Sequence, residues 1–411
     1  MSIKFSKISF EISMNKLAFV IFLVSGTLGW FFLLNIQAIE IFSSFVPNNP
    51  FWLSFGQILF YGFAIFWGGV GVSIGGRVDR RKLLLTWIAL GVVTTALLPF
   101  FHGPVFSIIF SSLLGLSLGL GLPCSTAFIA ECTVAEERAR VSGIILFLSF
   151  ILAAIAAFVA SSIGSGIISL LLIGALLRST SFFAFIFNEC ESGKERIVMR
   201  HNQTIYKNFA YYLIPWVLIN IASTIAINLI PNHPDYSWAI DTGSKLRLGI
   251  IAISALLVGS VADRFGRKPP LLIGLTMLVI SSFIISFAMS PTTAFIFLAI
   301  SGFSWGSFFA IFLSVPGDLA IFSLREKFYF LSTGLPIAIL FFTSPFLGGP
   351  GSGSISSLPA SVPQILGFIL FISLIPLFFA KESLPESKMK ARRLKDYLKK
   401  VRQVIGETKK E

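Results

Sequence analysis

The segment GSVADRFGRKPP, Gly259–Pro270, places four charged residues among the six positions from Asp263 to Lys268, between two long apolar runs. A related segment, GGRVDRRKLLL, lies upstream at Gly75–Leu85. Each segment connects two apolar stretches and is therefore interpreted as a short charged turn between buried helices. A turn that is repeated in this way indicates a chain built from two related halves.

The composition of the chain is that of a membrane protein. The 411 residues are 55% hydrophobic and 12% charged, whereas soluble domains carry about 25% charged residues. Long apolar runs recur along the whole chain, and the bilayer core forces them to be helical because it offers no water to backbone groups. The sequence therefore predicts an all-α integral membrane protein with twelve transmembrane helices. The expected spans are residues 17–37, 52–75, 83–101, 105–130, 141–162, 166–187, 209–230, 246–262, 269–289, 292–317, 328–347 and 363–380.

Basic residues mark one side of this membrane protein. Of the 32 Lys and Arg, all but Arg178, Lys245 and Arg247 lie in the N-terminus, in alternate loops or in the C-terminal tail. Such loops face the cytoplasm, so we expect both termini there, in a multi-pass protein of the cell (plasma) membrane. Membrane topology and contact with lipids then explain the net charge of +13, and no nucleic-acid partner is expected.

The chain divides at its longest predicted cytoplasmic connection. We expect a cytoplasmic N-terminus over 1–16, a six-helix half over 17–187, a central loop over 188–208, a second six-helix half over 209–380, and a basic amphipathic cytoplasmic tail over 381–411. At an offset of 187 residues Glu131 overlays Asp318, Arg138 overlays Arg325, and GLSLG at Gly115 overlays GFSWG at Gly302. The halves are therefore predicted to be pseudo-symmetric six-helix bundles that arose by duplication.

The second charged turn closely resembles the signature loop of the major facilitator superfamily, Gly-x-x-x-Asp-Arg-x-Gly-Arg-Lys, which that family carries after span two and again after span eight. The first copy departs from the pattern because it lacks the x-Gly insertion. Glu131 to Arg138 after span four, and KESLPES at Lys381–Ser387 after span twelve, resemble elements of sugar-porter-like members. The resemblance covers residues from about 17 to 385 and implies a secondary transporter that works by alternating access.

The acids in the charged turns point to a gate at the cytoplasmic face. Basic residues alone would orient the helices, but acids contribute little to topology, so Asp79 and Asp263 need another role. A carboxylate beside the start of a helix is stabilised by the helix dipole and can pair with neighbouring Arg and Lys. The resemblance implies that such a network closes the cytoplasmic side and breaks when that side opens. The predicted gating residues are Gly75, Asp79, Arg80, Glu131, Arg138, Gly259, Asp263, Arg264, Gly266, Arg267, Lys268, Asp318 and Arg325.

Polar residues inside apolar spans are indicators of a substrate pathway. The resemblance implies that spans one, four, seven and ten surround a central cavity, and the polar groups there are uncharged. Arg178 is the one charge deep in a span, and its two interpretations are an anion-binding group and a structural group. The predicted pathway residues are Trp30, Asn35, Arg178, Tyr212, Asn220, Asn228, Ser304 and Trp305.

The sequence thus predicts a transporter and not an enzyme, with a small-molecule substrate, membrane lipids around it and a monomeric state. No metal or other cofactor is expected, because the chain has no phosphate-cradling Gly-Lys-Ser/Thr loop and no cluster with metal-ligand spacing. The uncharged pathway favours a sugar-like or other small polar metabolite, moved by uniport or by symport with a proton as the candidate coupling ion. Two alternatives stay open: an organic-anion transporter that uses Arg178 or Arg247, and a membrane receptor or scaffold without transport.

Overall fold

The computed structural model describes residues 12–47, 49–164, 166–187, 203–228, 230, 234–321, 324–347 and 362–384, and in these residues the regular structure is helical. Several helices begin where a side chain satisfies free backbone N–H groups. Asn49 accepts from the N–H of Phe51 at 3.2 Å, and Ser290 forms a capping box with Thr293. The elements are α1 (Met14–Ile36), α2 (Ala38–Ser43), α3 (Pro50–Ile74), α4 (Arg80–Leu97), η1 (Leu98–Phe100), α5 (Pro104–Gly119), α6 (Leu122–Cys132), α7 (Arg138–Ile163), α8 (Ile167–Ser179), η2 (Thr180–Ile186), α9 (Gln203–Asn228), α10 (Pro234–Phe265), α11 (Lys268–Phe287), α12 (Pro291–Phe312), α13 (Val315–Leu319), α14 (Arg325–Leu347), α15 (Val362–Ile372) and α16 (Leu374–Phe379).

Ten helical segments in the described part of the chain are long and apolar enough to cross a membrane. They are Met14–Ile36, Pro50–Ile74, Arg80–Phe100, Pro104–Cys132, Arg138–Ile163, Ile167–Ile186, Thr204–Ile225, Asp235–Phe265, Lys268–Phe287 and Pro291–Leu319. The remaining two expected spans correspond to α14 and to the shorter apolar helix Gln364–Phe379. The amphipathic helix expected in the tail lies outside the described residues, which end at 384, and so does the central loop up to residue 202.

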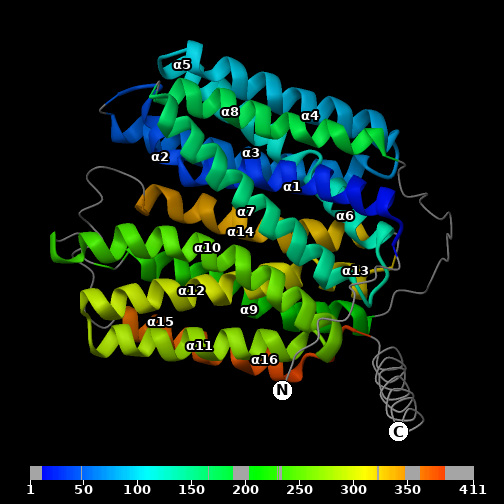
Figure 1. Ribbon diagram of the computed structural model, residues 1–411, viewed down its shortest axis with the longest axis vertical. Coiled ribbons are helices and arrows are strands. Elements are labelled where there is room, and N and C mark those ends of the chain that lie inside the picture. The colour runs from blue at the N-terminus through cyan, green and yellow to red at the C-terminus, as the bar shows by residue number, and fades with distance from the viewer. Residues whose placement is uncertain are drawn as a thin grey trace, which may run out of the picture.

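The helices of the two parts of the chain lie in different regions of the molecule (Figure 1). Helices α1–α8, here the N-terminal half, occupy the upper region of the picture, and α9–α16, the C-terminal half, occupy the lower region. Two seams join the halves, because α7 packs against α10 and α3 packs against α14. In the α7–α10 seam Gly259 lies directly on the carbonyl oxygen of Ala139, where a side chain would not fit.

Two of the membrane segments are broken at similar places. The breaks separate α5 from α6 and α12 from α13. Each second piece carries a proline near its start, Pro123 in α6 and Pro316 in α13, and proline lacks the N–H that would continue the helical hydrogen bonds. These short helices present Glu131 and Asp318 at the same end of the molecule.

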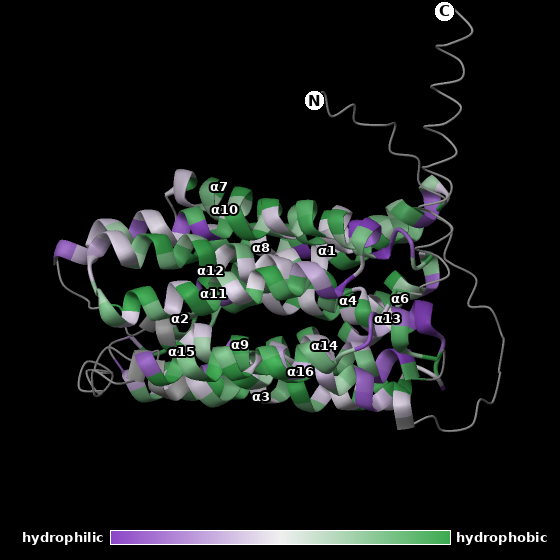
Figure 2. Cartoon of the chain, turned by 90° about the horizontal axis from the view of Figure 1, so that it is seen from below, coloured by the Kyte–Doolittle hydropathy of each residue, from purple (hydrophilic) through white to green (hydrophobic). Residues whose placement is uncertain are grey.

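The distribution of hydropathy follows the helices. Figure 2 shows hydrophobic residues along the helix lengths and hydrophilic residues near their ends, with a dense group beside α6 and α13. Large apolar side chains also face outward, such as Phe66 and Phe158, which are 62% and 72% exposed. Lipid accounts for this exposure, because exposed apolar surface of this extent is unfavourable in water. We call the α3–α4, α6–α7, α10–α11 and α13–α14 turns, together with residues 380–384, the charged end.

Candidate functional site

Arg80 connects the two halves at the α3–α14 seam. Its NH1 group pairs with Glu131 Oε1 of the same half at 2.8 Å, and its NH2 group pairs with Glu326 Oε1 of the other half at 2.5 Å. Gly75 leaves room for the second carboxylate, because a Cβ at that position would lie 2.6 Å from Glu326 Oε2. One arginine therefore holds α4, α6 and α14 together at the charged end.

Asp318 has the corresponding role near the α7–α10 seam. Its carboxylate accepts from Arg138 NH1 at 2.5 Å and from Arg267 Nε at 3.0 Å. Arg138 begins α7 in the N-terminal half, so the first of these pairs crosses between the halves. Arg267 also donates to the carbonyl of Ala135 across the seam at 2.5 Å. The side chains of this group are 6% exposed or less, and buried charges of this kind are stable only when their hydrogen bonds are satisfied.

Asp263, the acid of the segment quoted first, caps a helix of the other half. Its carboxylate accepts from the backbone N–H groups of Ala139 at 3.2 Å and Arg140 at 2.9 Å at the start of α7, and it pairs with Arg267 NH1 at 2.5 Å. The positive end of the α7 dipole favours this negative charge. Burial alone would lower the pKa of Arg267, but the charges of Asp318 and Asp263 raise that pKa by more, so the guanidinium stays charged.

The segment after α16 completes the charged end. Glu382 accepts from the backbone N–H groups of Arg267 at 2.7 Å and Lys268 at 3.1 Å at the start of α11. Lys268 Nζ in turn donates to the carbonyls of Phe378 at 2.7 Å and Ala380 at 3.0 Å near the end of α16. Gly266 has a φ of 102°, which favours glycine, and its missing side chain leaves room for the Glu382 carboxylate.

The structure brings most of the predicted gating residues together and leaves two apart. Asp79 accepts from the N–H of Arg81 at 3.0 Å and so caps its own helix, and 54% of its side chain is exposed. Arg264 is also exposed. The predicted residues that lie in the network or directly beside it are Gly75, Arg80, Glu131, Arg138, Gly259, Asp263, Gly266, Arg267, Lys268, Asp318 and Arg325.

The two charged turns differ in where their first helix ends. Asp263 lies inside α10, one helical turn before Arg267, and can reach both that arginine and α7. In the first turn α3 ends at Ile74 and Asp79 is the N-cap of α4, so Asp79 caps that helix and only Arg80 enters the network. Glu326 was not among the predicted gating residues, yet it pairs with Arg80. Its only signal in the sequence is its position next to Arg325.

A cavity of about 260 Å³ lies between the two halves, toward the ends of α1 and α9 that are far from the charged end. Both halves contribute to it, and most of its lining is apolar, including Phe32 of α1, Phe150 of α7, and Trp305 and Phe309 of α12. Within the described residues, no group of His, Cys, Asp or Glu is arranged to hold a metal ion. The cavity is thus suited to a small organic solute.

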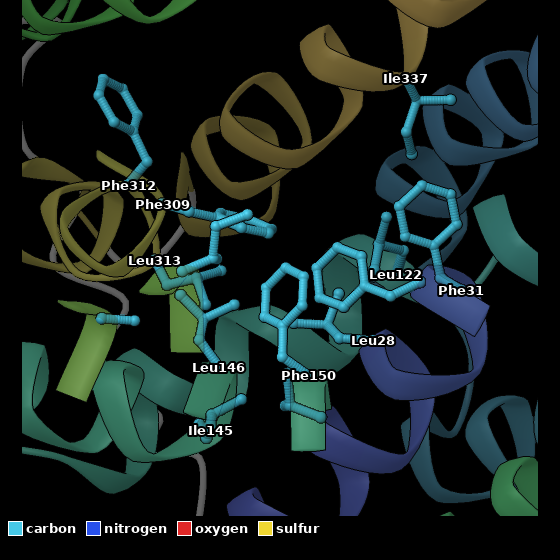
Figure 3. Close-up of a cluster of buried hydrophobic side chains, with 14 of the residues drawn as sticks. Leu28, Phe31, Leu122, Ile145, Leu146, Phe150, Phe309, Phe312, Leu313 and Ile337 are labelled. Atoms are coloured by element: carbon cyan, nitrogen blue, oxygen red, sulfur yellow. The ribbon is translucent and has the colours of Figure 1, made fainter. Parts of the chain in front are cut away.

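An apolar cluster forms part of the cavity wall and extends from it toward the charged end (Figure 3). The labelled side chains converge from α1, α6, α7, α12 and α14. Phe150 and Phe309 line the cavity, whereas Leu146 and Leu313 lie about one turn nearer the charged end and are fully buried. The cluster therefore continues from the cavity wall toward the ion pairs of the charged end.

The polar groups of the cavity are few and distinct. Asn35 Oδ1 accepts from the Tyr61 hydroxyl at 2.7 Å, which leaves its amide N–H groups available. Asn220 Nδ2 donates to the Trp216 carbonyl at 2.8 Å, which leaves the side-chain oxygen Oδ1 of Asn220 available. Arg247 is the charged side chain among the described lining residues. Because α10 begins at Pro234 and not near the expected position 246, Arg247 lies well inside the helix and not at its entrance.

Of the predicted pathway residues, Asn35, Asn220 and Trp305 line the cavity. Tyr212 lies at the charged end, where its hydroxyl donates to the carbonyl of Lys381 at 2.8 Å. Ser304 donates to the carbonyl of Gly274 at 2.6 Å inside the C-terminal half. The side chain of Asn228 is outside the described part of the structure.

Arg178 and Trp30 pack together inside the N-terminal half, away from the cavity. Arg178 is fully buried, with its guanidinium 4.0 Å from the ring centre of Trp87 and 5.0 Å from that of Trp30. It donates to the Thr27 hydroxyl. Two aromatic faces stabilise this charge, and no lining position connects it to the cavity.

Comparison with known proteins gives one family and a common fold. The sequence profile of the family described as Major Facilitator Superfamily matches residues 17–320. Multidrug resistance protein MdtL of Vibrio parahaemolyticus serotype O3:K6 (strain RIMD 2210633) is 27% identical over 142 residues. That match spans only about a third of MdtL, 34% of its length, and 34% of this chain.

Two solved structures share the fold at low sequence identity. The proton:xylose symporter XylE bound to 6-bromo-6-deoxy-D-glucose has a TM-score of 0.70 at 15% identity, over 92% of this chain and 98% of XylE. The human organic anion transporter MFSD10 (TETRAN) also has a TM-score of 0.70, at 12% identity, over 89% of this chain and 99% of MFSD10. At such identities the similarity concerns the fold alone.

Proposed function

This chain belongs to the major facilitator superfamily of membrane transporters, and from that premise we propose that it moves one small solute by alternating access between its two halves. The fold similarity to XylE supports a twelve-helix architecture, which α14 and the helix Gln364–Phe379 complete. In this proposal the halves rock about the central cavity, which opens to one side of the membrane at a time.

The main support for the proposal is a cavity between two halves that ion pairs join at one end. Arg80–Glu326 crosses the α3–α14 seam, and Arg138–Asp318 crosses near the α7–α10 seam. Both pairs must break before the charged end can open. The residues predicted to act as a gate therefore have the right partners to stabilise one of two states.

The basic residues indicate how the protein is oriented in the membrane. The charged end carries Arg and Lys in each of its turns, so we place it at the cytoplasmic face of the cell membrane, with both termini on that side. The state described here is then closed toward the cytoplasm. One chain supplies both walls of the cavity, which supports a monomer as the working unit.

Members of this family bind small-molecule substrates and are often coupled to protons. Among the described residues, no Asp or Glu lines the cavity, which favours uniport or a coupling group placed elsewhere. Glu40, just beyond α1, borders two other surface pockets at the far end. A sugar-like substrate needs many hydrogen-bonding partners, and the mostly apolar lining offers few.

Counterflow in liposomes tests this function. The purified protein is reconstituted, and exchange is measured for neutral sugars, polyols and small organic anions. We expect exchange of at least one class, and slower exchange in Arg138→Gln with an equal amount of inserted protein. A folded protein that exchanges no solute across a wide panel would contradict transport and favour a receptor or scaffold.

A further inference from the structure

We infer that the central cavity binds a small amphipathic anion, with Arg247 holding its negative group and the aromatic wall holding its apolar body. This inference rests on the proposed function, because it names the substrate class of the same cavity. It depends on three features: an unpaired cation, an apolar and aromatic wall, and uncharged polar groups in the same cavity.

Arg247 is a half-buried cation without a counter-ion in the described structure. It lies within the membrane segment Asp235–Phe265, and none of the described residues forms an ion pair or a hydrogen bond with its side chain. Its Nε is buried and has no acceptor. An unpaired charge inside a membrane protein is costly and marks a functional site by default. A ligand that supplies a negative group would remove this cost.

The side chain is held in place at its base. A Cβ on Gly302 of α12 would lie 3.2 Å from Arg247 Cγ, so α12 packs closely against that part of α10. The neighbouring charges on α10, Asp241 and Lys245, are exposed and do not line the cavity. The guanidinium is therefore the one charged group that the described lining presents to a solute.

Aromatic rings form much of the cavity wall. Phe32 and Phe150 stack with ring centres 4.1 Å apart, and Trp305 meets Phe309 edge-on at 5.0 Å. These side chains favour an apolar body. A sugar bound here would leave several hydroxyl groups against apolar surface without hydrogen bonds, which is unfavourable.

The uncharged polar groups that line the same cavity match an anion as well. A carboxylate fits the two-pronged guanidinium, and the amide N–H groups of Asn35 add donors because the Tyr61 hydroxyl already occupies its oxygen. The side-chain oxygen Oδ1 of Asn220 can accept from one hydroxyl or N–H group of the solute. A cationic solute finds no carboxylate among the described lining residues. The volume of about 260 Å³ suits a compact molecule, since drug-sized ligands occupy pockets of roughly 300–1,000 Å³.

Binding to the purified full-length protein tests the inference. The probes are benzoate and hexanoate, and benzamide and hexanamide serve as uncharged controls of the same shape. We expect saturable binding of at least one carboxylate by calorimetry and clearly weaker binding of its amide. Arg247→Gln should weaken carboxylate binding about ten- to a hundredfold, and Arg247→Lys should restore part of it. Lys245→Gln is the matched control, because it removes an exposed positive charge from the same helix and should leave binding unchanged.

Three results would overturn the inference: no saturable binding of either carboxylate, equal binding of acids and amides, or unchanged carboxylate binding in Arg247→Gln. Counterflow separates this failure from failure of the proposed function. If neutral solutes exchange equally in wild type and in Arg247→Gln, the proposed transport function stands and the proposed anion site is refuted. If carboxylates bind through Arg247 but never cross the liposome membrane, the anion site stands and the proposed transport function is refuted.

Discussion

Asp263 shows how one residue can connect two halves of a protein. Its carboxylate pairs with Arg267 of its own half and caps α7 of the other half. Its near-copy Asp79 caps only its own helix and is largely exposed. The same acid in two duplicated turns therefore has different roles, because Asp263 lies inside α10 whereas Asp79 lies beyond the end of α3, directly before α4.

Asp263→Asn tests this role. The amide keeps an acceptor oxygen for α7 but removes the charge that faces Arg267, so we expect a loss of about 2–4 kcal/mol in the free energy of unfolding and slower counterflow. Insertion should be unchanged, because acids contribute little to topology. Thermal unfolding and counterflow measure the two effects. Asp79→Asn is the matched control, with an expected change within about 0.5 kcal/mol; similar losses in both variants would contradict the role given to Asp263.

Arg178 is a buried charge that we interpret as structural. Arg178→Met removes the unpaired charge and keeps an apolar stem between Trp30 and Trp87. The loss of cation–π attraction is offset by removal of a costly buried charge, so we expect the free energy of unfolding to stay within about 2 kcal/mol of wild type. Calorimetric binding of benzoate or hexanoate should be unchanged. A folded variant that no longer binds the carboxylate would place Arg178 in the substrate pathway after all.

At the scale of helices, glycines set how closely the elements approach. Gly115 and Gly119 let α5 lie against α3, and Gly302 and Gly306 let α12 lie against α10. The sequence showed these glycines at one common offset of 187 residues. The helix breaks at Pro123 and Pro316 were not predicted, because an apolar run gives no sign of where a membrane helix is interrupted.

Gly259→Ala tests the α7–α10 seam. A Cβ there would overlap the Ala139 carbonyl, so we expect the seam to loosen and the charged end to open more often. The measurement is the rate at which a water-soluble maleimide labels Leu146→Cys, a buried position next to the cavity, in a background free of other cysteines. We expect a several-fold faster rate, since a shift of about 1–2 kcal/mol changes a population by roughly 5–30-fold.

The matched control for that experiment is on the same helix. A Cβ at Gly249 would meet nothing within 4 Å, so Gly249→Ala should leave the labelling rate unchanged. Equal rates for Gly259→Ala, Gly249→Ala and wild type would show that the close contact at Gly259 does not hold the charged end shut.

At the scale of the molecule, the sequence predicts the class of protein better than it predicts the site. Long apolar runs have one stable form in a bilayer, and ten of them are long helices in the described structure. The lining of the cavity depends instead on how each helix is rotated. Ser304 and Trp305 are neighbours on α12, yet one bonds to Gly274 and the other faces the cavity, because successive helical residues point about 100° apart.

Arg247 is a second residue whose place in the site could not be predicted from the sequence. Arg247 stands at the edge of the expected span 246–262, but α10 starts at Pro234 and carries Arg247 into the cavity wall. Hydropathy marks the apolar part of a helix and not its full length. The anion site therefore depends on packing between α10 and α12, which no local pattern in the sequence reports.

The distance between the two halves at the charged end, measured by pulsed electron paramagnetic resonance in liposomes, tests alternating access most directly. Spin labels at Val134 of the N-terminal half and Phe265 of the C-terminal half would sit on exposed side chains, 42% and 62% exposed, beside the ion pairs. The account predicts two populations of distance, with Asp263→Asn shifting molecules from the short to the long one. A single distance that is the same in wild type and in Asp263→Asn would contradict a gate at the charged end.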